Sequence, residues 1–337
     1  MSQTKIPVSL FLFSLIILLL GYFSPAVVTQ AQDDESRILF SSKHQDVPKL
    51  YTMRLDGSDI QYLGDGFEVG GEVVSFRQSP DQAKIAYIAR KNRDGVYPTN
   101  ELFVYDLQSG ANTQITNNGV EKGDVNWLPD STTLVYLALG PEGQYDEIRS
   151  LNLTSGKIQT LVTAQSLAEA IGLEMVIIRE LKISPDGTKL VGWVKTGLPE
   201  VYSILIVMDV DDTNIRQLTA NEEFVGFPVW GLSNYIYFVR TSGVYPTDKY
   251  SEVNRLNLDT MAAETVVSLQ EIATDEKTRN IIVLDVTPDE RIIWQLVSSQ
   301  NLYVYDPVTN QVERYFIDMP EKIDVLGVVN LRTLPSK

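Results

Sequence analysis

A short turn motif recurs along the chain at intervals of about fifty residues. Proline followed by aspartate stands between two apolar runs at Pro80-Asp81, Pro129-Asp130, Pro185-Asp186 and Pro288-Asp289. The last interval is about twice the others, and the missing copy falls at residues 230–234, which follow the same kind of run. Periods of roughly 40–50 residues are typical of repeat proteins, and four-stranded propeller blades fall in this range.

A second series of turns predicts six units. Each turn follows a strand-like run that ends in a polar residue, and these residues are Arg54, Asp106, Asn152, Asp209, Asn257 and Asp306. The runs between turns are short and rich in Val, Ile, Tyr and Phe, as strands are. The sequence therefore predicts an all-β fold, a six-bladed β-propeller of four-stranded blades, in which the Pro-Asp turn joins the first two strands of a blade.

The two ends of the repeat predict how the ring closes. The first unit begins at residues 37–42, which match the second strand of the other units, so its first strand is missing. Residues 323–331 form a surplus strand-like run after the sixth unit. We expect this run to return to blade one as its missing strand, because closure removes an exposed strand edge.

Two insertions between blades are not strand-like. Ser166 and Glu169 have the spacing of a capping box that opens a helix over residues 167–175. Ser268 and Glu271 repeat that spacing at the start of a polar stretch. We expect a short helix at each place.

Residues 1–31 have the features of a targeting segment. Lys5 supplies a positive charge, residues 8–23 are almost wholly apolar, and residues 29–31 offer a small-x-small cleavage site. The apolar run is shorter than the ~20 residues of a membrane-spanning helix. We expect a signal peptide (1–31), a short linker (32–36), the propeller (37–331) and a C-terminal tail (332–337). The protein is then exported, periplasmic or extracellular, and retention as an N-terminal membrane anchor is the alternative.

The composition is acidic, with 44 Asp and Glu against 28 Lys and Arg and a formal net charge of −16. Nucleic acids and anionic membrane surfaces need clustered basic residues, so neither is expected as a partner. The chain has no cysteine, which excludes disulfides and thiol chemistry. Its one histidine, His44, is expected in a surface loop, and no Gly-x-Ser-x-Gly motif accompanies it. We expect no metal site and no cofactor.

The turns resemble those of the TolB-type six-bladed propeller family. The resemblance rests on Trp-x-Pro-Asp at residues 127–130 and Ser-Pro-Asp-Gly at 184–187, and on following strands such as Lys189-Leu190-Val191-Gly192. It covers residues 37–331 and implies the propeller fold without an activity. Unit five departs from it, since its turn lacks Pro and Asp. The resemblance is to the propeller only, and we expect no counterpart of the α/β domain that precedes it in TolB.

The innermost strands carry candidate binding residues. Counting back from the turns puts one residue of each unit at a common level, namely Arg77, Asn126, Lys182, Val229 and Asp285. A second level lies two residues earlier, at Ser75, Asp124, Glu180, Phe227 and Val283. Such mixed charges suit a small polar ligand in the central channel. The alternative is that they only pair with one another, as buried charges require.

An identical pentapeptide is the strongest non-periodic signal. Gly-Val-Tyr-Pro-Thr occurs at residues 95–99 and 243–247, between the second and third strands of units two and five. These loops and the blade-to-blade connections share one face, and long loops on a rigid scaffold often carry binding residues. We predict that Tyr97 and Tyr245 form a partner site that reaches Arg179, Glu180 and Asp124 at the channel mouth. Ordinary turn chemistry is the alternative reading.

The sequence favours a non-catalytic binding module. We expect a monomer that binds an envelope or extracellular protein, or a small polar ligand, through its loop-rich face. The alternative is a carboxylate-based enzyme of the lyase or glycosidase type at the channel mouth, which would need two suitably opposed carboxyls for hydrolysis. A structural role in the envelope, as an anchored protein, is a third possibility.

Overall fold

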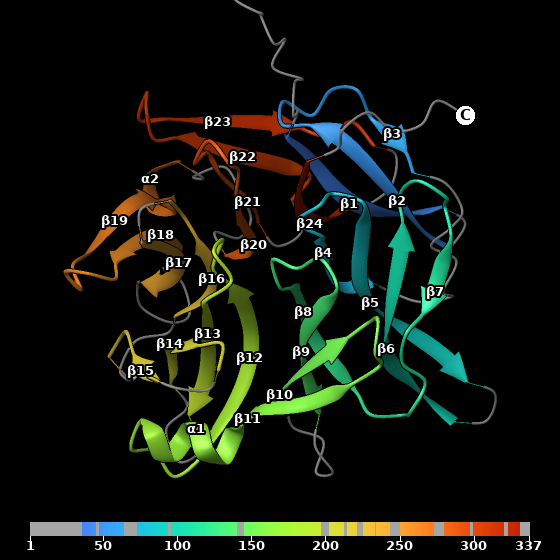
Figure 1. The fold of residues 1–337 in the computed structure, drawn as a ribbon. Coiled ribbons are helices and arrows are strands. Elements are labelled where there is room, and N and C mark those ends of the chain that lie inside the picture. The colour runs from blue at the N-terminus through green and yellow to red at the C-terminus, as the bar shows by residue number, and fades with distance from the viewer. Residues whose placement is uncertain are drawn as a thin grey trace, which may run out of the picture. The chain divides into compact units, whose positions relative to one another are not determined.

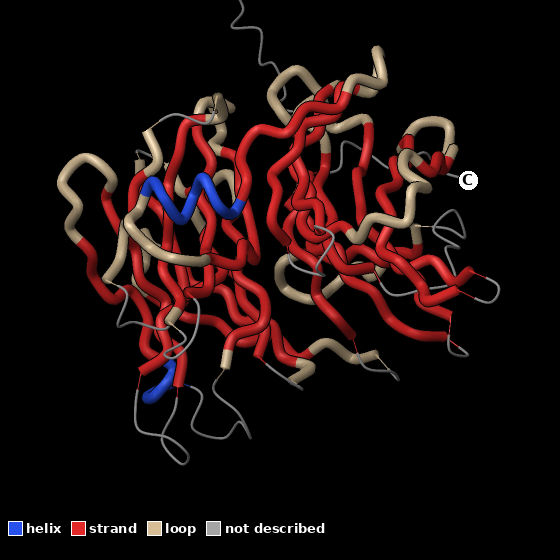
Figure 2. The backbone as a smooth tube through the Cα atoms, turned by 90° about the horizontal axis from the view of Figure 1, so that it is seen from below, coloured by secondary structure: helices blue, strands red, loops and turns tan. Residues whose placement is uncertain are grey.

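The computed structural model describes residues 36–44, 47–63, 73–93, 96–139, 145–196, 202–211, 214–220, 225–232, 234–242, 250–272, 280–296, 299–319 and 323–330. Within unit Glu35–Lys337, these residues form six four-stranded antiparallel sheets set in a ring (Figure 1). The predicted all-β six-bladed propeller is confirmed. Two short helices, α1 (Ala164–Ala170) and α2 (Leu269–Ile272), lie outside the ring of strands (Figure 2).

The strands of each blade follow one another from the inside of the ring outward. Blade one holds β24 (Ile323–Asn330), β1 (Ser36–His44), β2 (Val47–Arg54) and β3 (Gln61–Tyr62). Blade two holds β4 (Val73–Gln78), β5 (Lys84–Arg93), β6 (Val96–Asp106) and β7 (Asn112–Gln114). Blade three holds β8 (Lys122–Trp127), β9 (Thr133–Leu139), β10 (Tyr145–Asn152) and β11 (Ile158–Thr163).

The other three blades keep the same order. Blade four holds β12 (Val176–Ile183), β13 (Lys189–Thr196), β14 (Ser203–Asp209) and β15 (Arg216–Gln217). Blade five holds β16 (Val225–Trp230), β17 (Tyr235–Ser242), β18 (Tyr250–Asn257) and β19 (Ala263–Ser268). Blade six holds β20 (Ile281–Val286), β21 (Ile292–Leu296), β22 (Asn301–Asp306) and β23 (Gln311–Phe316).

The ring closes as the sequence predicted. β24 pairs with β1 in antiparallel register, from Ser36 opposite Asn330 to Ser42 opposite Ile323. Blade one is therefore built from both ends of the repeat. No inner edge of β1 is left open, which removes a site for unwanted strand pairing.

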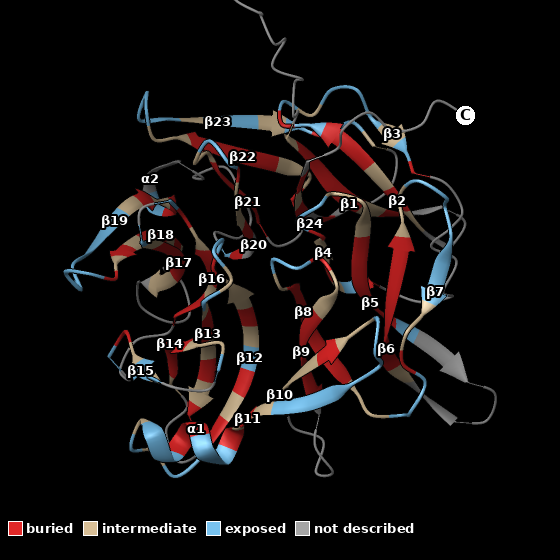
Figure 3. Ribbon diagram, in the orientation of Figure 1, coloured by how far each residue is buried: buried red, intermediate tan, exposed pale blue. Residues whose placement is uncertain are grey.

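The hydrophobic core lies between neighbouring blades. The middle strands are mostly buried, whereas β7, β11 and β23 are largely exposed (Figure 3). In one apolar cluster, Ala86 and Ile88 of blade two pack with Val125 and Tyr136 of blade three. Burying a large apolar side chain stabilises the fold by about 1.5–3 kcal/mol, so each blade depends on its neighbours.

The turns between the first two strands share one backbone feature. In each, a residue has a positive φ angle, and these residues are Gln82, Ser131, Gly187, Asn234 and Glu290. The aspartate before it accepts nearby hydrogen bonds, as Asp186 does from the Ser184 hydroxyl at 2.6 Å and the Thr188 amide at 3.0 Å. At Gly187 a side chain is excluded altogether, because a Cβ would lie 2.2 Å from the ring of Pro129 in the neighbouring blade.

All six inner strands carry a register shift at a similar height. The shifts lie between Val73 and Ser75, Lys122 and Val125, Ile178 and Glu180, Gly226 and Val229, and Ile281 and Val283, and in β24 opposite Leu39 and Phe40. A bulge bends its strand and changes the direction of the side chains beside it. In blade five the bulge includes Phe227 at φ +53, a strained conformation for a bulky residue.

Two local predictions were wrong in detail. Helix α1 begins three residues earlier than expected, because Thr163 is its N-cap and Ser166 is the N3 residue of the capping box. The first pentapeptide copy is not a loop. β6 begins at Val96, which pairs with Arg93, so Tyr97 continues a strand. The second copy lies outside the described residues.

Candidate functional site: the central channel

The inner strands line two cavities that follow one another along the channel. The larger, of about 390 Å³, lies at the starts of the inner strands and includes Val74, Gly123 and Arg179. We call it the loop-side cavity. The smaller, of about 280 Å³, lies at the Pro-Asp turns and is walled by Pro80, Pro129 and Pro185. We call it the turn-side cavity. Arg77, Lys182 and Asp285 border both, so they form the narrow zone between them.

The two predicted levels of channel residues correspond to these cavities. The turn-side cavity is lined by every member of the first level, Arg77, Asn126, Lys182, Val229 and Asp285. The loop-side cavity is lined by four members of the second level, Ser75, Asp124, Glu180 and Phe227. In blade six the side chain of Val283 lies outside the described part, and its neighbour Leu284 borders the cavity.

Asp124 connects three blades. From blade three, its carboxylate accepts a short hydrogen bond from the Ser75 hydroxyl of blade two and one of 3.1 Å from the Leu181 amide of blade four. It also lies 3.4 Å from the Lys182 ammonium. The Asp124 side chain is only 8% exposed, so its charge is balanced by these donors rather than by water. Asp124 therefore holds the blades together as well as lining the cavity.

Glu180 and Lys182 form an ion pair inside the channel. The Lys182 Nζ lies 2.7 Å from the Glu180 Oε1, and the Trp193 indole donates to the Glu180 Oε2 at 3.3 Å. Burial raises the pKa of Glu180 to about 8, and the Asp124 charge adds to the increase. Glu180 therefore takes up a proton more readily than an exposed glutamate does.

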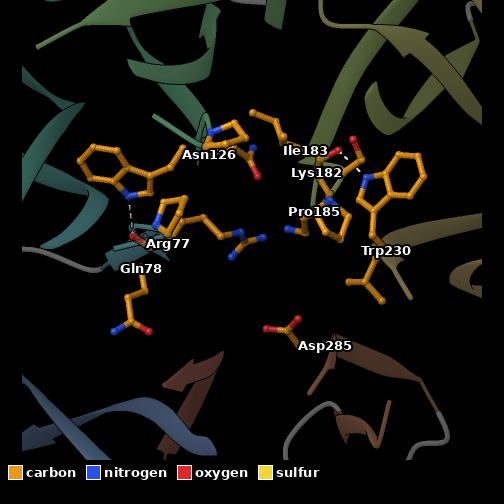
Figure 4. Close-up of a pocket in the computed structure, with 13 residues that line it drawn as sticks. Arg77, Gln78, Asn126, Lys182, Ile183, Pro185, Trp230 and Asp285 are labelled. Carbon is orange, nitrogen blue, oxygen red and sulfur yellow. Dashed lines mark hydrogen bonds between the residues drawn. The ribbon is translucent and has the colours of Figure 1, made fainter. Parts of the chain in front are cut away.

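Arg77 and Asp285 face the narrow zone from different sides (Figure 4). The Arg77 Nη1 donates to its neighbouring Phe76 carbonyl at 2.6 Å, and the guanidinium forms no ion pair with a described carboxylate. Asp285 accepts from the amides of Val286 and Val328, both at 2.9 Å. Burial raises the pKa of Asp285, and the Arg77 charge opposes that increase without reaching contact distance.

Two tryptophans fix the walls of the turn-side cavity. The Trp127 indole donates to the Arg77 carbonyl at 2.9 Å, and the Trp230 indole donates to the Lys182 carbonyl at 2.9 Å. Each bond joins the end of one inner strand to the inner strand of the preceding blade. These bonds hold the backbones of both cationic residues, so their side chains extend from fixed positions.

A second buried ion pair was missed by sequence reasoning. Lys122 lies 2.8 Å from Glu101, and both side chains are almost completely buried between blades two and three. Glu101 also accepts from Thr116 at 2.7 Å and from the Gly119 amide at 3.1 Å, so the pair is well satisfied. A glutamate and a lysine inside otherwise apolar strands were the available signal. The pair does not border either cavity.

The remaining predicted residues divide into two groups. Arg179 is exposed and borders the loop-side cavity beside Glu180, as predicted. Tyr97 lies on β6, but its side chain is outside the described part, and Tyr245 is outside it entirely. His44 ends β1 rather than standing in a loop. The structure therefore brings together Arg77, Asp124, Arg179, Glu180, Lys182 and Asp285, and it leaves the two tyrosines as predictions.

The described side chains include no group of three His, Cys, Asp or Glu placed to hold a metal ion. Neither helix of the described part is long or apolar enough to cross a membrane. The chemistry available in the channel is that of carboxyls, cations and indole rings.

Known proteins resemble this chain in structure. No protein-family model matches it, and no curated protein is significantly similar to it in sequence. Among solved structures, TolB from Acinetobacter baumannii is similar with a TM-score of 0.62 and 13% identity, over 87% of this chain and 67% of that one. A putative TolB from Agrobacterium tumefaciens has a TM-score of 0.50 and 17% identity, over 69% and 89% of the two chains.

An enzyme with the same architecture is also similar. An oligogalacturonate lyase in complex with manganese has a TM-score of 0.50 and 15% identity, over 83% of this chain and 73% of the lyase. Identities this low establish the fold and leave the activity open. The resemblance first suggested by the Pro-Asp turns is confirmed at the level of structure: the chain is a six-bladed propeller, and its fold is similar to that of the two TolB structures.

Proposed function

We propose that this protein is an exported, non-catalytic binding module, and that its partner site lies on the face where the inner strands begin. The loop-side cavity supports this proposal more than any other feature. It combines exposed Arg179 with the acidic side chains of Glu180, on the same strand β12, and Asp124, on the neighbouring inner strand β8. A partner that inserts a polar group there meets charges already held in place by contacts between blades.

The likeness to TolB-type propellers supports a protein as the partner, since this fold presents long connections on a rigid ring. Tyr97 and Tyr245 belong to the same proposed site. Aromatic residues of this kind are common among interface residues that dominate affinity, because they bury a large area at low entropic cost. The charged cavity would then be the centre of the site and the tyrosines its rim.

Capture of partners from an envelope extract tests this proposal. The double variant Tyr97→Ala/Tyr245→Ala and the single variant Arg179→Ala should each weaken capture, the double variant by roughly 2 kcal/mol or more. The matched control is Asp130→Ala/Asp186→Ala on the turn face, which should capture the partner like the wild type. Equal capture by all four proteins would place the site elsewhere.

Export is tested separately. The proposed signal peptide predicts a mature protein that begins near Gln32, and intact-mass measurement after expression in an exporting host would detect it. A product that retains Met1 and sediments with membranes would instead support the N-terminal anchor.

One observation favours a carboxylate-based enzyme as the second candidate. Glu180, with its pKa raised to about 8, would hold a proton at neutral pH, as a general acid must. The fold likeness to oligogalacturonate lyase is consistent with such a role. Incubation with oligogalacturonate, with and without manganese, would detect unsaturated products by their ultraviolet absorbance. Activity that is lost in Glu180→Gln would replace the binding proposal.

A further inference from the structure

The turn-side cavity has an arrangement of charges that the proposed partner site does not use. The cationic ends of Arg77 and Lys182 point toward one another across it, and the Asp285 carboxylate faces the same space from the third side (Figure 4). Lys182 is already paired with Glu180 and Asp124, whereas the Arg77 guanidinium forms no ion pair with a described carboxylate. The cavity therefore has the polarity of a small ligand site.

The unused hydrogen-bonding capacity supports this reading. Among the described residues, Arg77 gives one hydrogen bond, to the Phe76 carbonyl, although a guanidinium has five N–H donors. Lys182 uses its ammonium on Glu180 and Asp124, which lie on the loop side. The free donors of Arg77 suit a carboxylate, because the planar guanidinium binds both oxygens together.

Asp285 restricts which carboxylates fit. Each of its oxygens accepts one backbone amide, from Val286 and Val328, and each has a further lone pair available. A plain carboxylate would bring a second negative charge toward Asp285. A ligand with a hydroxyl or ammonium group beside its carboxylate would instead donate to Asp285 while Arg77 holds the carboxylate.

The walls limit the size of the ligand. The cavity of about 280 Å³ is bounded by the turn prolines and by Trp127 and Trp230, whose indoles are fixed to the neighbouring strands. Pockets for drug-sized ligands begin at about 300 Å³, so this one accommodates a small ligand together with some water. The ring of prolines leaves access from the turn face, opposite the proposed partner site.

We propose that the turn-side cavity binds a small carboxylate with a hydroxyl or ammonium group on the neighbouring carbon, held by Arg77 and Asp285. The class includes 2-hydroxy acids and α-amino acids. Arg77 binds the carboxylate, Lys182 contributes positive charge, and Asp285 accepts from the second group. The site lies toward the turn face, although its three charged residues also border the loop-side cavity.

Calorimetric titration of the full chain at neutral pH with three probes of similar shape tests the proposal. Propionate carries only the carboxylate, lactate adds a hydroxyl, and alanine adds an ammonium group. Lactate or alanine should bind with a Kd of roughly 1 mM or tighter, and propionate at least about tenfold more weakly. The preference between lactate and alanine distinguishes a hydroxy-acid site from an amino-acid site.

Two variants assign the residues. Arg77→Gln should weaken binding at least about tenfold, whereas Arg216→Gln, an exposed arginine of β15, should leave it unchanged. Asp285→Asn should remove most of the preference over propionate. If Arg77→Gln does not fold, Arg77→Lys keeps the charge and should still weaken binding, since it cannot grip both oxygens. Failure of all three probes to bind the wild type, equal binding of propionate, or an unchanged Kd in Arg77→Gln would overturn the proposal.

Discussion

The two halves of the channel wall are built from the same four-stranded blades, but one half is lined mainly by polar side chains and the other mainly by apolar ones. Blades two to four supply the polar half, which consists of Ser75, Arg77, Asp124, Glu180 and Lys182. Blades five, six and one supply a mostly apolar half, which consists of Phe227, Val229, Leu284, Val325 and a single charged residue, Asp285.

The halves also hold their blades together differently. In the polar half, Asp124 receives hydrogen bonds from blades two and four, so one side chain joins three sheets. In the apolar half, Asp285 joins only two sheets, through the Val328 amide. The repeat thus determines the positions of the inner side chains. Whether those side chains are polar or apolar determines which neighbouring blades are joined by hydrogen bonds.

Removal of the closing strand should have the largest effect, and it tests the apolar half. A chain truncated after Glu321 loses β24, its pairing with β1 and the buried side chains of Ile323, Val325 and Val329. We expect an aggregating or markedly less stable protein, because β1 becomes an open edge. Solubility and thermal unfolding measure this. A soluble truncated protein with an unchanged Tm would show that the apolar half does not need its closing strand.

The two aspartates provide the most direct comparison of the halves. Asp124→Ala leaves Lys182 short of a buried partner and the Leu181 amide unpaired, so it should cost about 3–5 kcal/mol of unfolding free energy. Asp285→Ala removes only backbone hydrogen bonds and should cost about 1–3 kcal/mol. Chemical denaturation of both variants gives the values. Equal costs would show that the contacts of Asp124 across the blades add nothing.

The pH dependence of stability tests the proton in the polar half. The pKa of Glu180 is about 8 in the folded protein and near 4.5 when unfolded, so the folded state binds more protons between these values. Stability should therefore fall as pH rises from about 4.5 to 8, by at most about 1.4 kcal/mol per pH unit. Urea unfolding across this range should show a shallower slope for Glu180→Gln. Parallel curves for the two proteins would assign the proton to another group.

The smallest effect is expected on the turn face. Asp186→Ala removes acceptors for the Ser184 hydroxyl and the Thr188 amide in an exposed turn, which should cost about 1 kcal/mol. Partner capture should not change. Denaturation and the capture assay, done on the same preparation, separate the two quantities, and a loss of capture would move the binding face to the turns.

The sequence predicted the parts of the channel that depend on period. Distance from the Pro-Asp turn located the first level of residues in all five units, because no bulge intervenes between that level and the turn. The second level was less secure. The bulges lie beside it, so a count from the turn reaches a register shift at that level.

Other features depend on contacts that no local pattern encodes. The pair of Glu101 and Lys122 joins different blades, so neither residue indicates the other in the sequence. The α1 start was misplaced because Ser166 and Glu169 have the spacing of a capping box, whereas Thr163 and Ser166 form the box in the structure. Tyr97 was expected in a loop between the second and third strands of its unit, yet β5 and β6 extend as a long hairpin past it.

The pairing of β24 with β1 has a consequence for the time course of folding. Arg37 pairs with Val329, so the first described strand can complete its sheet only after the last described strand has been made. Bringing together segments so far apart in sequence carries a large loop-closure cost, and contacts of this kind slow folding. During synthesis, blades two to six are therefore available before blade one can be completed. Pairing of β24 with β1 is therefore the step that completes the ring of blades.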